Sequence, residues 1–297
     1  MPEVNGTDII SDRVTFGVPD WNSMREQGLL FADMHFHTNC SDSFTSPELA
    51  IKMAHLKHSG FAVTDHNLVR NVRPILEMKD ETDFVIPGME ISSWDGPHIL
   101  TYFYSADDLV SYWERNVRPY MSPNPWLAIK RDTRQILESL EDENCLVSAA
   151  HPMGYFSGSK GVEKAIRKNI LTDDICELLD AYEVICSGMS HKNNLEAVQN
   201  AQRHGLAITG GTDGHLHYEL GNVVSVCEAD DIEGFFKCIK DRKNLVIGTE
   251  KNAPQKVAMG TAAFFRFMPH VPASLFVHYQ TMIGKNSNIR RKIRQGP

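Results

Sequence analysis

The chain has six cysteines, but no two of them are closely spaced, so it lacks the C-x-x-C pattern of redox motifs and many structural zinc sites. They are Cys40, Cys145, Cys176, Cys186, Cys227 and Cys238. Most of them stand in apolar surroundings, which is typical of reduced, buried thiols in the cytoplasm. This excludes a disulfide-stabilised secreted domain, and we expect a cytoplasmic location.

A signal peptide and a membrane-spanning run are also missing. Residues 1–20 are mixed and acidic, without an apolar stretch after a basic start. Residues 262–283 are rich in Phe, Met and Val, but charged residues, histidines and prolines break the segment too often for it to cross a bilayer. We interpret it as helices that pack back onto the body, with an interfacial anchor as the alternative.

Acidic residues are absent after Glu250, where eight Lys and Arg residues follow. The first 250 residues hold the other 22 Lys and Arg and all 38 Asp and Glu, which gives them a net charge of −16. An acidic body disfavours long nucleic-acid duplexes, whose binding rewards basic tracks. The basic end suggests a peripheral membrane contact or a partner of its own.

The size and balance of the chain fit one large domain. Hydrophobic residues make up 42% of the 297 positions and charged residues 23%, as in a globular protein with a sizeable core. We expect a lead-in over residues 1–28, an α/β barrel over 29–250 with an insertion at about 105–144, and a basic, aromatic C-terminal extension over 251–297.

An apolar stretch at residues 30–38 carries the first candidate ligands. It is expected to be a strand, and since strand side chains alternate with a period of two, Asp33, His35 and His37 share one face. Two imidazoles beside a carboxylate suit a divalent transition metal such as zinc, manganese or iron. Taken alone, a strand that carries two structural histidines explains the pattern equally well.

The same arrangement recurs along the chain, where short apolar runs end in a histidine or an acid. These later residues are His66, Glu90, His151, Asp213 and His215. Runs of this kind indicate buried parallel strands, and in a barrel of alternating strands and helices their carboxyl ends meet on one face. His98 begins its run instead of ending it, so spacing alone supports it least. The repetition predicts a metal site.

Residues 105–144 form a longer connection than barrels ordinarily use. Two helical stretches separated by prolines are expected there, and an insertion of this length at the active-site face is usually functional. Its cations could reach a substrate phosphate, or they form a solvated surface face. They are Arg115, Arg118, Lys130, Arg131 and Arg134.

With these residues the chain resembles the PHP superfamily, named after polymerases and histidinol phosphatase. Its Asp-x-His-x-His element and following acid are similar to Asp33, His35, His37 and Asp42, and its Thr-Asp-His element to residues 64–66. Its Pro-Gly-x-Glu element is similar to residues 87–90, its single histidines to His98 and His151, and its closing element to residues 211–215. Cys186-Ser187-Gly188 departs from the Asn-Gly pair that many relatives carry.

The resemblance implies a distorted (β/α)7 barrel that holds two to three divalent ions. By position, the first would be held by His35, His37, Glu90 and Asp213. Glu90 would bridge to a second held by His98 and His151. The third would be held by Asp42, His66 and His215.

We predict hydrolysis of a phosphate monoester, on a small metabolite or nucleotide, by a hydroxide that bridges the metals. Asp33 and Asp65 are expected to orient His35 and His66, and His217 is a candidate general acid. A phosphodiesterase or exonuclease acting on short nucleic acid or nucleoside bisphosphates is the alternative within enzymes. A regulatory barrel without catalysis is the alternative of another class, and C–N hydrolysis lacks a candidate carboxylated lysine.

Overall fold

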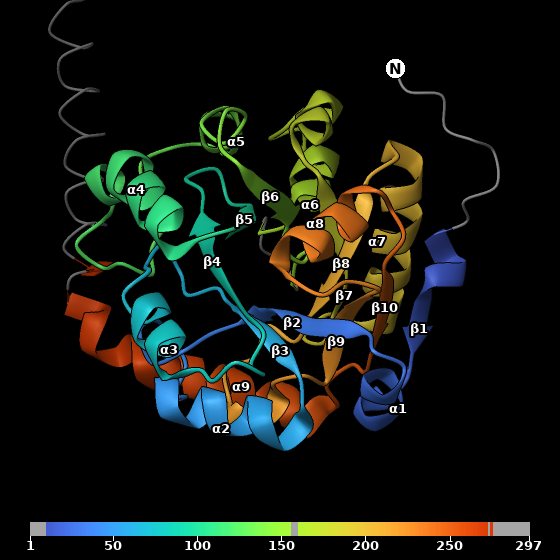
Figure 1. The fold of residues 1–297 in the computed structure, drawn as a ribbon. Helices are drawn as coiled ribbons and strands as arrows, with labels where there is room; N and C mark the ends of the chain where they lie inside the picture. Colours follow the sequence, from blue (N-terminus) through green and yellow to red (C-terminus); the bar gives the residue numbers. More distant parts are fainter. Residues whose placement is uncertain (1–9, 156–159, 273, 276–297) are drawn as a thin grey trace, which may run out of the picture.

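A curled sheet of ten strands forms the centre of the molecule, in the order β1-β10-β9-β2-β3-β4-β5-β6-β7-β8. The computed structural model describes residues 10–155, 160–272 and 274–275. The strands are β1 (Val14–Phe16), β2 (Leu30–Phe36), β3 (Gly60–Val63), β4 (Val85–Ser92), β5 (His98–Phe103), β6 (Cys145–Ala149), β7 (Ala181–Cys186), β8 (Ala207–Gly211), β9 (Val223–Cys227) and β10 (Leu245–Gly248). Helices surround this sheet (Figure 1).

The α-helices are α1 (Trp21–Glu26), α2 (Pro47–Lys57), α3 (Val72–Met78), α4 (Ala106–Asn116), α5 (Thr133–Glu138), α6 (Val162–Arg167), α7 (His191–His204), α8 (Ile232–Lys240) and α9 (Ala253–Phe267). Short 3-10 turns are η1 (Ile10–Arg13), η2 (Arg118–Tyr120), η3 (Asp173–Leu178), η4 (His217–Glu219) and η5 (Met268–His270). Within the described residues, no helix is both long and apolar enough to cross a membrane.

Strands β2 to β8 form the predicted seven-stranded barrel. Phe36, at the end of β2, makes a parallel bridge with Gly214 just after β8, and the His37 amide donates to the Gly214 carbonyl at 3.0 Å. A β-carbon on Gly211 would lie 2.6 Å from the His35 amide nitrogen, so this close approach requires glycine. The expected distorted (β/α)7 barrel is confirmed.

Strand β9 pairs antiparallel with β2 and β10, and within the barrel the expectation of parallel strands is wrong at β5. This strand pairs antiparallel with both β4 and β6. Its first residue, His98, pairs with Ser92 at the end of β4. The reversal therefore places the start of β5 at the edge where the parallel strands end, which explains why a histidine begins this run.

The insertion does not arise at the active-site face as expected. Because β5 is reversed, its end lies beside Cys145 at the start of β6, at the opposite end of the barrel. From there α4 runs back toward the ligand-bearing edge, where the Trp113 indole donates to the Asn67 carbonyl at 2.8 Å. The side-chain amide of Asn67 in turn donates to the carbonyls of Pro125 and Leu127. The end of α4 and the segment that follows it, up to Ile129, thus reach that edge.

Local signals in the sequence set several helix ends. Ser46 caps α2 by accepting from the Leu49 amide, and Pro47 occupies the first turn, as the sequence predicts. The helix ends at Lys57, because His58 takes the left-handed conformation. The lead-in also contains regular structure, since β1 pairs with β10 and α1 follows it.

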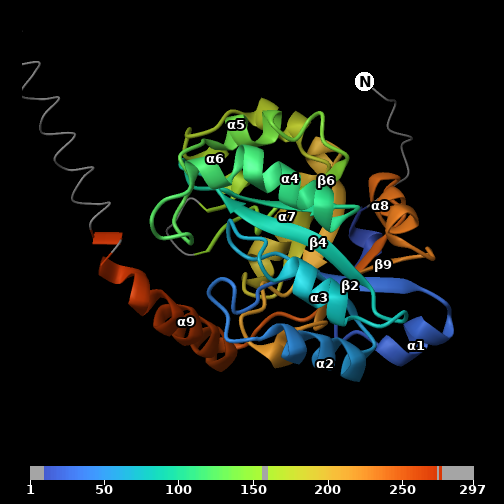
Figure 2. The same cartoon turned by 60° about the vertical axis from the view of Figure 1, so that its left-hand side comes forward.

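Helices α8 and α9 lie on opposite sides of the barrel (Figure 2). Phe235 and Phe236 of α8 are fully buried in a cluster that includes Met34, Ile86 and Tyr102 from three strands. The first part of the C-terminal extension is α9, which contacts the body through side chains described below. The remaining predicted cations of this extension, Lys285, Arg290, Arg291, Lys292 and Arg294, lie outside the described residues.

The contact between β8 and β2 predicts a large difference between two glycine substitutions. Gly211→Ala forces a β-carbon against the His35 backbone and should lower the free energy of unfolding by about 1–3 kcal/mol. Gly260→Ala, inside α9 with open space around it, should raise it by up to about 1 kcal/mol. Urea unfolding of both variants at one fixed metal concentration measures this, and equal effects would contradict the close approach.

Candidate metal centre

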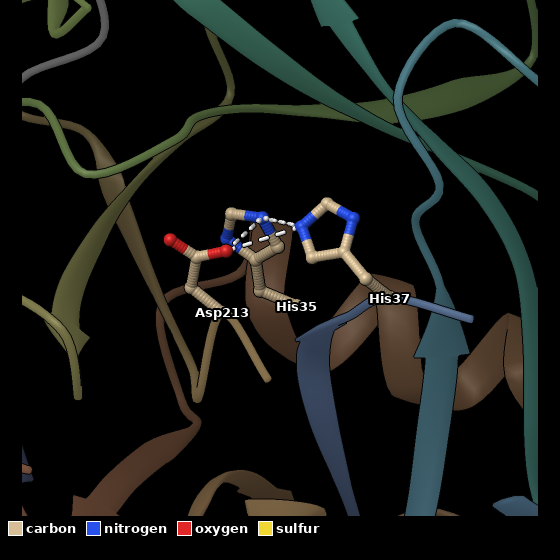
Figure 3. Close-up of side chains that lie close together, drawn as sticks. All are labelled: His35, His37 and Asp213. Atoms are coloured by element: carbon tan, nitrogen blue, oxygen red, sulfur yellow. Dashed lines mark hydrogen bonds and ion pairs between the residues drawn. The ribbon is translucent and has the colours of Figure 1, made fainter. Parts of the chain in front are cut away.

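His35, His37 and Asp213 meet where β2 ends beside the segment that follows β8 (Figure 3). The two imidazole Nε2 atoms are 3.2 Å apart, and Asp213 Oδ1 lies 3.1 Å from that of His37 and 3.6 Å from that of His35. All three side chains are buried. Two ring nitrogens and a carboxylate oxygen thus face one small space, as ligands of a shared ion do.

Glu90, near the end of β4, contacts histidines from four other segments. Its Oε1 lies 2.8 Å from His98 Nδ1 and 3.1 Å from His151 Nε2. Its Oε2 lies 2.9 Å from His66 Nδ1 and 3.4 Å from Nε2 of His35. One buried carboxylate therefore adjoins both the first group and a second group formed with His98 and His151.

Asp42 lies in the loop after β2, and the remaining ligands lie close to its carboxylate. Its Oδ2 lies 3.0 Å from His215 Nε2 and 3.6 Å from His66 Nε2, and its Oδ1 lies 3.7 Å from His37 Nδ1. The structure thus brings together all nine residues that the sequence marks as ligands. They come from seven separate segments of the barrel edge.

The donor set fits divalent metal ions. Asp42 Oδ1, Glu90 Oε2 and His151 Nδ1 are buried and have no hydrogen-bond partner among the described residues. Buried polar atoms normally find such partners, and unmatched ones call for an explanation such as an ion. Imidazole and carboxylate donors without thiolate suit zinc, manganese or iron, which agrees with the sequence analysis.

The pKa values show how strongly the cluster favours charge. Burial alone would raise the pKa of Asp42 and Glu90, but the surrounding histidines hold both well below the usual range. Burial would lower the pKa of His66, but the carboxylates of Glu90 and Asp42 outweigh burial and raise it to about 10. Burial would also lower the pKa of His215, but nearby carboxylates, Asp42 first, raise it to about 9. His98 is different, because burial dominates and lowers its pKa to about 3.

Asp33 and Asp65 do not orient the rings of His35 and His66, contrary to our expectation. Asp33 accepts from the amide and hydroxyl of Thr212 and from the amide of Gly221. Asp65 accepts from the Thr38 amide and hydroxyl and from the Ser41 hydroxyl. Both carboxylates fix the loops that carry ligands, and neither hydrogen-bonds to an imidazole.

Glu183 of β7 performs the orienting role instead, and the sequence analysis missed it. Its Oε1 lies 3.0 Å from His35 Nδ1, and its Oε2 accepts from the His151 amide at 2.6 Å. The side chain is almost completely buried. A lone acid inside the apolar run of β7 was the available signal, since buried carboxylates are rare without partners.

Tyr155 and Lys251 support Asp213 from two sides, and sequence reasoning missed both. The Tyr155 hydroxyl donates to Asp213 Oδ2, and its ring lies 5.0 Å from the ring of His151. The Lys251 ammonium donates to the carbonyls of Thr212 and Asp213 and lies 3.3 Å from Glu219 Oε1. Because Lys251 is almost buried, the start of the C-terminal extension belongs to the support of this ligand.

Helix α9 adjoins the loops at the ligand-bearing edge. The Arg266 guanidinium donates to the carbonyls of Asn39 and Ser41, in the loop that leads to Asp42. The Lys256 ammonium donates to the Met189 carbonyl after β7. These contacts make α9 part of the rim of the site.

The remaining site predictions are not brought to the cluster. His217 is half-buried on η4 and contacts the Tyr218 ring, and among the described residues no contact joins it to the ligands. The described contacts of the five insertion cations favour the alternative of a solvated surface face. Arg115 pairs with Glu143, Arg118 with Glu114, Arg134 with Asp174, Arg131 bonds to Asn116, and Lys130 is exposed before α5.

Comparisons with known proteins agree with this architecture. A family model described as PHP-associated matches residues 191–244, which include Asp213 and His215. No curated protein sequence matches the chain. A protein of Bifidobacterium adolescentis, provisionally named a metal-dependent phosphoesterase, shares 17% identity at a TM-score of 0.52, with 71% of this chain and 96% of that one covered.

Two further solved structures share the fold. A two-domain protein of Bacteroides vulgatus with a predicted PHP-like metal-dependent phosphoesterase has 14% identity and a TM-score of 0.54, covering 85% of this chain and 73% of its own. A lesion-specific endonuclease of Pyrococcus furiosus has 15% identity and a TM-score of 0.57, covering 73% and 57%. At such identities the likeness establishes the fold.

Proton release should accompany metal binding. Below pH 9 the metal-free protein holds protons on His66 and His215, whose raised pKa values keep the rings charged, and a metal ligand must be unprotonated. Adding Zn²⁺ to metal-free protein at pH 7.5 should therefore release protons, and the number should fall as the pH rises through 9 to 10. A pH indicator in weak buffer measures this, and a pH-independent value would contradict these charges.

Loss of Glu183 should weaken metal binding without unfolding the barrel. In Glu183→Gln the His35 ring loses a charged partner, and outer support of this kind is worth about 10–100-fold in metal affinity. Competition with a chelating dye measures the affinity per folded molecule. Glu163→Gln is the control, since Glu163 is an equally buried carboxylate that pairs with His204 away from the cluster. Equal losses in both variants would assign the effect to general destabilisation.

Proposed function

We propose that the chain is a member of the PHP superfamily and a metal-dependent hydrolase of phosphate esters that acts on monoesters. The observation that carries the proposal is the position of Glu90, whose two oxygens adjoin separate groups of histidines. A carboxylate placed in this way is what a site with two or more neighbouring ions needs.

We assign the ligands as the resemblance implies. His35, His37, Glu90 and Asp213 would hold one ion, Glu90 with His98 and His151 a second, and Asp42 with His66 and His215 a third. When bound, such ions lower the pKa of a coordinated water and offset the charge of the phosphoryl oxygens. Because this chemistry generates the nucleophile from water, the chain itself needs no serine or cysteine nucleophile.

The side chains around the ligands would keep this arrangement fixed during the reaction. Glu183 holds the His35 ring, Tyr155 holds the Asp213 carboxylate, and Lys251 holds the Asp213 backbone carbonyl. Burial and nearby carboxylates raise the pKa of Tyr155 well above its usual range, so the phenol keeps its proton and remains a donor to Asp213.

A phosphodiesterase or nuclease is the second candidate, favoured by the fold shared with the lesion-specific endonuclease. An endonuclease Q that shares the fold has been solved in complex with a 27-mer duplex substrate with an abasic lesion at the active site. The acidic body of the present chain argues for a smaller substrate, since duplex binding rewards a continuous basic surface.

Turnover of paired synthetic esters tests the proposal. With Mn²⁺ added, the protein should hydrolyse 4-nitrophenyl phosphate in preference to bis(4-nitrophenyl) phosphate. Glu90→Gln and His151→Asn should each reduce kcat/KM by about 10²–10³-fold, because each variant leaves the charge of a bound metal ion without one of its ligands. Glu163→Gln should keep its activity.

Other outcomes would replace the proposal. Cleavage of the diester alone would make the protein a phosphodiesterase. If protein shown to contain metal hydrolysed neither ester, the result would favour the alternative of a regulatory barrel without catalysis. Full activity of Glu90→Gln would exclude the bridging role of this carboxylate.

A further inference from the structure

A cavity of about 570 Å³ lies beside the metal centre, between the loops that follow β6 and β7. Its volume is within the range of sites for small molecules. Residues from α6, α7 and α9 complete its walls. The lining comprises Met153, Gly154, Tyr155, Lys164, Arg167, Lys168, Gly188, Met189, Ser190, Lys192, Asn193, Glu196 and Lys256.

The charged side chains of this cavity are almost all cationic. Five of them are Lys or Arg, and Glu196 is the one acid in the described lining. Glu196 pairs with Arg167 at 2.8 Å and lies 3.9 Å from Lys192. The lining thus has an excess of four positive charges in a body that is otherwise acidic. A local positive field of this kind attracts anions of small size.

The structure holds two of these cations at the walls. The Lys256 ammonium donates to the Met189 carbonyl at 2.9 Å, which uses one of its three N–H donors. The Lys164 ammonium donates to the Tyr155 carbonyl at 3.2 Å. Burial, followed by the charge of Lys168, lowers the pKa of Lys164. Grouping these like charges has an energetic cost that a bound anion would offset.

The first turn of α7 adds to this field. Ser190 caps the helix, and Lys192 and Asn193 of its first turn line the cavity. A helix of 14 residues carries partial positive charge at this end. The helix end and the cations therefore act in the same direction.

Tyr155 separates the cavity from the metal centre. Its side chain lines the cavity, while its hydroxyl donates to Asp213. The wall is tightly packed, since a β-carbon on Gly188 would lie 2.5 Å from this hydroxyl. One side chain therefore stands between a ligand of the proposed ions and the cationic cavity, on the same face of the barrel.

We propose that this cavity binds a second anionic group of the substrate, a phosphate on the end remote from the reacting ester. The proposal rests on the proposed function, because it takes the metal centre as the place where the first phosphate reacts. A substrate with two phosphates would span from the ligand cluster, past Tyr155, to Lys164, Lys168 and Lys192. The confined positive region favours a small molecule over a nucleic-acid strand, which would need a longer basic track.

Synthetic bisphosphates of graded length test this subsite. The metal-loaded full-length protein is titrated by calorimetry with the bisphosphates of ethanediol, butanediol and hexanediol, each against its monophosphate. At least one bisphosphate should bind tenfold or more tightly than its monophosphate. Lys168→Glu/Lys192→Glu should reduce that ratio by about 10–100-fold, the effect of losing charge-assisted hydrogen bonds to phosphate. The neutral pair Lys168→Gln/Lys192→Gln should give an intermediate loss.

A matched control carries the same change in net charge. Lys52→Glu/Lys237→Glu alters exposed lysines on α2 and α8, outside the cavity, and should keep the preference of the unmodified protein. No preference for any bisphosphate, or an equal loss in the control, would overturn the subsite. Hydrolysis of 4-nitrophenyl phosphate is measured in parallel. Hydrolysis without a bisphosphate preference refutes the subsite alone, and a preference without hydrolysis refutes the proposed function alone.

Discussion

The burial of one negative charge, that of Glu90, constrains the whole barrel. A carboxylate at this depth is stable only if cations or strong donors surround it, and five imidazoles do so here. Those rings come from the ends of β2 and β3, the start of β5 and the end of β6. The Glu90 carboxylate and the groups around it come close together because of three features of the fold. These are the strand order, the reversal of β5 and the contact of β8 with β2.

Most of the ligands could be predicted from sequence because they follow a short-range rule, whereas Asp42 was assigned only by the resemblance. Apolar runs that end in His or Asp locate strand ends, and the ends of parallel strands share an edge. His98 was the weakest prediction for a physical reason. Strand direction depends on pairing between segments, and nothing inside the run from His98 to Phe103 shows that it is reversed.

The supporting residues could not be predicted because their roles depend on contacts across the chain. Glu183 meets a ring 148 positions away, and Lys251 reaches carbonyls 38 and 39 positions away. Asp33 stands two residues before His35, which made a contact with the His35 ring plausible, yet its carboxylate accepts from the His35 backbone amide and from Thr212 and Gly221. Spacing in sequence identifies which groups share a strand, and it does not determine which way a buried carboxylate points.

The reversal of β5 has a consequence for how such proteins can diverge. The insertion leaves and rejoins the barrel at the end remote from the ligands, and its middle part, from Trp113 on α4 to Ile129, lies near the ligand-bearing edge. No ligand belongs to that segment. Its length and sequence can therefore change over evolutionary time while the strand ends that carry the ligands keep their positions. The fold in this way allows the entrance to the site to be exchanged independently of the chemistry beneath it.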